Sequence, residues 1–82
     1  GNGVVASGPY STAMGYATTA SGQYSFAMGS SSAASALNSA AIGASTTANG
    51  QHSLAMGVST IASGTASTAL GSQTTASGPS ST

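Results

Sequence analysis

Residues 6–33 read ASGPYSTAMGYATT and then ASGQYSFAMGSSSA, two blocks of fourteen that agree at more than half of their positions. The pattern continues to Thr82 without insertion or deletion, so the chain divides into units of seven residues beginning at Ala6. Self-similarity at a fixed short period is the signature of a repeat architecture. We therefore expect a fold built from one small unit that is stacked many times.

Three positions of the seven-residue unit are nearly invariant. Position one is Ala from Ala6 through Ala76, and position three is Gly except at Ala36. Position six is Ser or Thr from Ser11 through Ser81. Position two alternates between a small polar and a large apolar residue, so the true repeat has fourteen residues. One domain is expected over 1–82, with coils at 6–19, 20–33, 34–47, 48–61 and 62–75 and a partial coil at 76–82.

A seven-residue period is also typical of coiled coils. Here each recurring Gly would cost a helix about 1 kcal/mol relative to Ala, and no charged pairs compensate. A glycine at a fixed place is better explained by a corner where φ is positive or where two backbones approach closely. The repeat therefore predicts an all-β fold, a parallel β-roll or solenoid in which each unit is a short strand plus a bend and fourteen residues make one coil.

Side chains alternate between the two faces of a strand, which separates inward from outward positions. With strands running from position six to position three of the next unit, positions six, one and three face inwards, and all are small. Such residues fit a roll whose two sheets lie closer than the usual spacing of about 10 Å. At Ala36, which replaces the Gly, either a positive φ costs about 1–2 kcal/mol or the coil bends differently.

Positions seven and two point outwards, and on one side of the roll they form an apolar ladder. Such a ladder is not stable in water on a monomer, so it predicts self-association. Each large side chain buried there would contribute about 1.5–3 kcal/mol, which a roll filled with Ala, Ser and Gly lacks, and the isolated chain is not expected to fold stably. A polarizable methionine stripe for ligand binding is disfavoured because Ile and Leu share the column. The predicted interface residues are Met14, Phe26, Met28, Ile42, Leu54, Met56 and Leu70.

The composition excludes several classes of function. The chain has no Lys, Arg, Asp, Glu or Cys, so it lacks the side chains for phosphate neutralisation, carboxylate acid–base chemistry, acidic Ca²⁺ sites and thiolate zinc sites. We expect no catalytic residues, no cofactor, no metal site and no nucleic-acid partner. Because there is neither an apolar run of about 18 residues nor a signal peptide, no membrane contact is expected and an export signal would lie outside this sequence.

The position-five column holds three candidate surface contacts, Tyr10, Tyr24 and His52. We interpret His52, the single histidine of the chain, as a solvent-facing side chain. A peripheral column would keep three copies of it too far apart to bind a metal. Tyr10 and Tyr24 lie one coil apart. They are either a structural ladder or adhesive contacts.

The hexapeptide Asn38-Ser39-Ala40-Ala41-Ile42-Gly43 resembles the Asn-Ser-Val-Ala-Ile-Gly motif of the head repeats in trimeric autotransporter adhesins, the YadA-like family of bacterial surface fibres. Ala-Ser-Gly at 6–8, 20–22, 62–64 and 76–78 is similar to the linking triplet of those heads. The resemblance covers residues 6–82. It implies a left-handed β-roll, a homotrimer around a common axis, and a location at the cell surface, anchored in the outer membrane through regions outside this sequence.

The resemblance also implies a non-enzymatic adhesion module that attaches a fibre to host matrix, cells or surfaces through many weak contacts. The absence of charge departs from the heads of that family. One alternative is an ice-binding solenoid, because Thr19, Thr47 and Thr75 form part of a threonine column that Ala33 and Ile61 interrupt. The other is a passive spacer in a phage or bacterial fibre. Thermal hysteresis would identify the first, and shortening by whole coils without loss of adhesion would identify the second.

Overall fold

The computed structural model describes residues 3–80 as eleven β-strands joined by turns, and no helix in this range could cross a membrane. The two ends of the predicted domain, residues 1–2 and 81–82, lie outside the described residues. They include Ser81 of the predicted position-six column. The longer strands are β2 (Thr12–Tyr16), β4 (Phe26–Ser30), β6 (Ala40–Ala44), β8 (Leu54–Val58) and β10 (Thr68–Ser72). The shorter strands are β1 (Val5–Ala6), β3 (Thr19–Ala20), β5 (Ala33–Ala34), β7 (Thr47–Ala48), β9 (Ile61–Ala62) and β11 (Thr75–Ala76).

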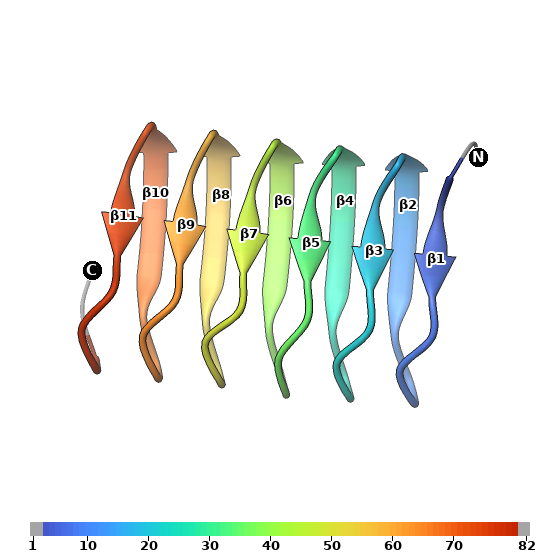
Figure 1. Ribbon diagram of the computed structural model, residues 1–82, viewed down its shortest axis with the longest axis horizontal. Helices are drawn as coiled ribbons and strands as arrows, with labels where there is room; N and C mark the ends of the chain where they lie inside the picture. Colours follow the sequence, from blue (N-terminus) through green and yellow to red (C-terminus); the bar gives the residue numbers. More distant parts are fainter. Residues whose placement is uncertain (1–2, 81–82) are drawn as a thin grey trace.

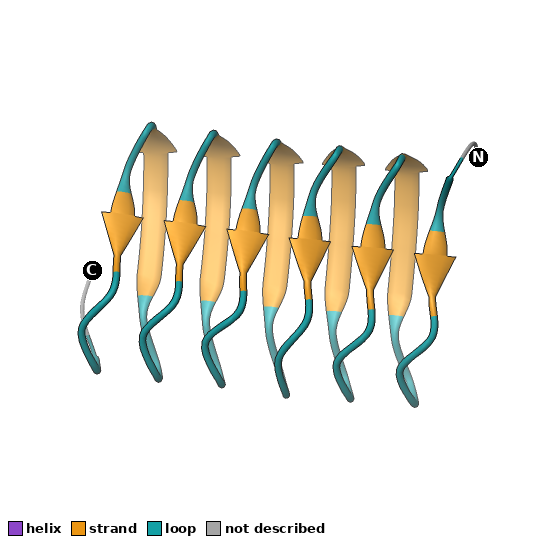
Figure 2. Cartoon of the chain, in the orientation of Figure 1, coloured by secondary structure: helices purple, strands orange, loops and turns teal. Residues whose placement is uncertain are grey.

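The strands form two parallel sheets, and the chain passes from one sheet to the other after every strand (Figures 1 and 2). The five-stranded sheet has the order β2-β4-β6-β8-β10, and the six-stranded sheet has the order β1-β3-β5-β7-β9-β11. In Figure 1 the front strands run downwards, the rear strands run upwards and the coils advance from right to left, which makes the roll left-handed. The predicted parallel β-roll of fourteen-residue coils is confirmed.

Each strand from β1 to β9 pairs in register with the strand fourteen residues further along the chain. Ala27 pairs with Ala41, and Gly29 pairs with Gly43. Equivalent positions of the repeat therefore stack directly on each other. A column in the aligned sequence is a ladder in space, with a spacing of about 4.8 Å between coils.

Small side chains fill the interior of the roll, as the alternation of faces predicts. The position-one alanines from Ala20 to Ala76 are at most 3% exposed, and the position-six Ser and Thr side chains from Thr18 to Ser67 are at most 2% exposed. The roll measures 31 × 25 × 10 Å along its principal axes, so it is very thin in one direction. Ala, Ser and Thr are the side chains that such a narrow interior accommodates.

The two halves of each coil differ more than the sequence predicts. Strands of one half run from position seven to position four and have five residues, whereas those of the other half cover only positions seven and one. The predicted common span from position six to position three is therefore wrong. In the short half the N–H groups of Ser7 and Gly8 both donate to the carbonyl of Ala20, at 3.0 and 3.4 Å. Because two successive donors share one acceptor, the ladder ends there and the chain turns.

The turn after each short strand places position five in the left-handed region. Ser11 N–H donates to the carbonyl of Gly8 at 3.1 Å, and Tyr10 between them has φ of +59°. A closing hydrogen bond with positive φ at the third residue is typical of a type II turn, in which Pro is favoured at the second residue, here Pro9. The residue with positive φ at this corner is therefore the one at position five, which is never Gly, and not the glycine at position three.

The glycines at position three have different roles in the two halves. In the long half Gly57 has φ of +117°. The regular alternation of side chains between the two faces of the strand ends at this residue. In the short half Gly22 is buried, and an added Cβ would overlap the carbonyl oxygen of Ala36 in the next coil. The predicted inward orientation of position three therefore holds for the short half, whereas no glycine of the long half is buried: Gly15, Gly29 and Gly71 are exposed, and Gly43 and Gly57 are half-buried.

Ala36 is accommodated by a local change in hydrogen bonding. Its φ is not positive, so the cost considered for a left-handed alanine does not arise. Its N–H donates to Ser39 Oγ at 3.2 Å, and the Ser39 hydroxyl donates to the carbonyl of Ala36 at 2.7 Å. The glycines at the same corner of the other coils have no positive φ either, so the hydrogen bonding changes at Ala36 while the roll continues through it.

The buried hydroxyl of Ser39 is expected to stabilise the roll more than that of Ser53 in the same column. Both side chains are at most 2% exposed, but Ser39 bonds to Ala36, whereas Ser53 Oγ has no hydrogen-bond partner. Replacing a bonded hydroxyl costs about 1 kcal/mol, and removing an unsatisfied buried hydroxyl costs little or stabilises. Ser39→Ala should therefore lower the midpoint of thermal unfolding further than Ser53→Ala, as measured by circular dichroism. Equal midpoints for the two variants would show that the bond to Ala36 contributes nothing.

Candidate functional site

The apolar face consists of the seven predicted interface residues on the outer side of the five-stranded sheet. In-register pairing aligns Met14 with Met28, Met28 with Ile42, Ile42 with Met56 and Met56 with Leu70. The two remaining members, at position seven, belong to a second column beside the first. The position-seven column is Thr12, Phe26, Ala40, Leu54 and Thr68.

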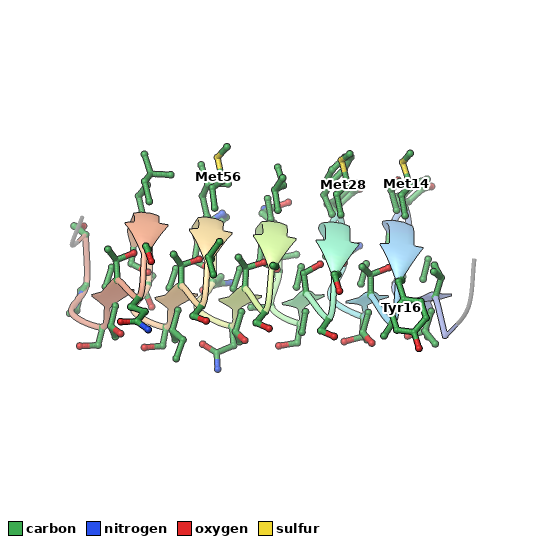
Figure 3. All side chains as sticks on the ribbon, turned by 90° about the horizontal axis from the view of Figure 1, so that it is seen from above. Met14, Tyr16, Met28 and Met56 are labelled. Atoms are coloured by element: carbon green, nitrogen blue, oxygen red, sulfur yellow. The ribbon has the colours of Figure 1, made fainter. Side chains whose placement is uncertain are left out.

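The side chains of the apolar face point away from the roll. Figure 3 shows Met14, Met28 and Met56 along one side, directed away from the short strands. Met14 is 52% exposed and Leu70 is 54% exposed, in contrast to the position-one alanines from Ala20 to Ala76, which the roll buries almost completely. The structure therefore brings all seven predicted residues together on one surface, over five consecutive coils.

The opposite outer face is narrower and more polar. Its strands have two residues each, and position seven holds Thr19, Ala33, Thr47 and Thr75. Two large apolar side chains share this column: Val5, which is 47% exposed, and Ile61, which is 41% exposed. The threonine column of the ice-binding alternative therefore lies on short strands and is interrupted twice.

The edge column is the row of position-five residues at the corner that follows each short strand. Its first two members are Tyr10 and Tyr24, whose rings stack with their centroids 5.1 Å apart and their planes 6° apart. The next two are Asn38 and His52, and Asn38 Nδ2 lies 3.2 Å from His52 Nδ1. With Nδ1 unprotonated, the Asn38 amide donates this hydrogen bond. The column ends with Ala66 and Ser80.

The edge column contains the three predicted surface contacts, and all of them are exposed. The contact of Asn38 with His52 was not predicted, although the fourteen-residue spacing places these two residues side by side in neighbouring coils. Tyr16, the third tyrosine, lies at the end of β2 on the other corner of the roll and is 60% exposed. Figure 3 shows it on the opposite side from the methionines.

The described part of the chain, residues 3–80, encloses no pocket and contains no group of three or more metal-ligating side chains. What it presents is a set of regular ladders along a thin rod. Each ladder repeats one position of the sequence repeat at the spacing of the coils. Such surfaces are suited to contacts with another elongated molecule or with further copies of the same roll.

Comparison with known families gives a match over most of the chain. A family model described as YadA head domain repeat (2 copies) matches residues 6–32, 34–60 and 62–82. The matched segments begin at Ala6, Ala34 and Ala62, which are position-one alanines two coils apart. No curated protein matched the chain.

Proposed function

The chain belongs to the YadA head family, and we propose that it forms one stretch of the head of a homotrimeric fibre that is displayed at a bacterial cell surface and mediates adhesion. The family is adhesin-like, and its members are trimeric autotransporter adhesins. The proposed role is structural and non-enzymatic: the roll holds binding surfaces at regular intervals away from the cell. Attachment to the outer membrane would be made by other regions of the fibre.

The proposal rests mainly on the apolar face. Five successive coils place Met, Ile or Leu in one straight column on the outer face, where Met14, Met56 and Leu70 are exposed and the other two are half-buried. One contiguous apolar column of this length is unusual for a monomer in water. Burying one such side chain contributes about 1.5–3 kcal/mol, whereas the interior of the roll holds only alanine and hydroxyl side chains. Packing three rolls through this face would supply the large-residue core that a single roll lacks.

A trimer has a further consequence for adhesion. Three identical rolls present every outer ladder three times at fixed separations, so that weak individual contacts combine into strong attachment. The chain carries no charged residue, so these contacts would be made by hydroxyl, amide and aromatic groups. Ionic strength acts mainly on exposed charges, and such adhesion would depend little on salt.

The proposal is tested by the mass and the adhesion of the same sample. Sedimentation equilibrium is expected to give three times the 7.5 kDa of one chain, and binding to matrix-coated surfaces is expected to change less than twofold between low and high salt. A folded monomer or dimer would contradict the trimer. Adhesion that collapses at high salt would contradict attachment through uncharged groups.

A further inference from the structure

Within residues 3–80, a run of consecutive planar side chains occupies position five at one of the two corners of the roll. Position five has the same left-handed backbone at both corners, with φ between +54° and +60° throughout. The corner that follows each long strand nevertheless holds mostly small residues: Ala17, Ser31, Ser45, Ser59 and Gln73. The edge column instead begins with two phenol rings, an amide and an imidazole in consecutive coils.

The fold does not require these flat side chains. Ala66 and Ser80 occupy the same column with φ of +58° and +57°, so small residues satisfy the same turn. The ring of Tyr10 stacks on that of Tyr24, yet Tyr10 remains 78% exposed and Tyr24 52% exposed. The hydroxyl groups and much of the ring surface are therefore left for an external partner.

Backbone hydrogen bonds hold the column in place before any partner arrives. The N–H groups of Tyr24, Asn38 and His52 each donate at 2.9 Å to a carbonyl one coil earlier. Successive side chains are thus displayed at the strand spacing of about 4.8 Å along the axis of the roll. A rigid row of this kind loses little conformational entropy when it binds a straight polymer.

We propose that the edge column binds a neutral, straight polysaccharide chain that lies along the axis of the roll. This inference rests on the proposed adhesive function and names the class of ligand. Phenol, amide and imidazole groups donate to and accept from sugar hydroxyls, and the free ring surface of Tyr10 can pack against the C–H face of a sugar. An anionic polysaccharide would gain no ion pair with Lys or Arg, because the chain contains neither.

A peptide fits this corner less well than a sugar chain does. Extended peptides are usually captured through main-chain hydrogen bonds to a free sheet edge. At the edge column the N–H groups of Tyr24, Asn38 and His52 are already bonded to the preceding coil. Recognition there must come from side chains, which favours a partner rich in hydroxyl groups.

The test uses the 82-residue chain with cellohexaose and chitohexaose as neutral probes and a heparin hexasaccharide as the anionic probe. Both neutral probes are expected to shift backbone amide NMR signals of residues 10–11, 23–25 and 37–39, and the heparin probe is not. Tyr10→Ser combined with Tyr24→Ser should weaken neutral-probe binding at least tenfold. Serine is chosen because Ser80 already adopts the required backbone. Tyr16→Ser, at the other corner, should change binding less than twofold.

Three results would overturn the inference: no neutral probe binds, heparin binds more strongly, or Tyr16→Ser costs as much as the double substitution. Circular dichroism and sedimentation of every variant separate loss of binding from loss of folding. A trimer that adheres to matrix but binds neither neutral probe refutes the saccharide site and leaves the proposed function intact. A monomer that binds cellohexaose through Tyr24 supports the saccharide site and refutes the trimer.

Discussion

A chain carrying Gly57→Ala is expected to lose the folded roll. Gly57 has φ of +117°, which L side chains rarely adopt, and an added Cβ would overlap the carbonyl oxygen of Gly71 and lie 2.9 Å from its carbonyl carbon. Gly71 cannot move away without disrupting the pairing of β8 with β10. Backbone strain of about 1–3 kcal/mol and overpacking of similar size act together on a small, marginally stable chain. Far-UV circular dichroism should show loss of the β-sheet signal.

Gly71→Ala is the matched control for this substitution. Gly71 has almost the same φ, +118°, but an added Cβ would meet only Thr74 Cγ2, at 3.5 Å. This variant is expected to remain folded and to lose about 1–3 kcal/mol from backbone strain alone. If both variants unfolded to the same extent, the backbone conformation rather than the contact between coils would explain the requirement for glycine.

Substituting Met28 and Met56 together by Ser is expected to abolish assembly and folding in one step. Both residues lie in the position-two column of the apolar face, two coils apart. Each substitution removes about 1.5–3 kcal/mol of stabilisation that comes from burying the side chain. In a trimer this loss occurs in all three chains. The remaining interior of Ala, Ser and Thr cannot compensate. Sedimentation equilibrium and circular dichroism should therefore report an unfolded monomer.

Ile61→Ser is the control for the methionine pair, because Ile61 is an exposed apolar residue on the opposite sheet, 41% exposed. This variant should remain a folded trimer. A folded monomer from the methionine double variant would place the source of stability inside the single roll. Dissociation by Ile61→Ser would instead place the interface on the six-stranded sheet.

The fourteen-residue period predicts the coil boundaries and the inward and outward positions, because parallel stacking in register makes every sequence column a spatial ladder. It identifies the buried alanines from Ala20 to Ala76 and the outward direction of Met14 and its column, as the structure confirms. The family resemblance rests on the same columns, and the match to the YadA head repeat confirms it. The role of the apolar face in a trimer stays a prediction.

The sequence does not reveal which residue of each corner has a left-handed backbone conformation. Position five holds Tyr, Ala, Ser and Gln as well as Asn and His, so no residue type marks it. The turn is visible only where Pro9 and Pro79 precede it. The unequal strands were missed for a related reason. Both halves carry the same Ala-x-Gly pattern, but shared acceptors such as the carbonyl of Ala20 end the short strands early.

The parallel pairing of one coil with the next also determines how the rod would respond to a pull. Tension along the axis acts in the direction of the hydrogen bonds between coils, so coils would peel from an end one after another. Each detached coil frees fourteen residues, which extend to roughly 46–50 Å in place of the 4.8 Å that they spanned. A fibre of such coils would lengthen in steps under flow, and stretching single molecules would reveal those steps.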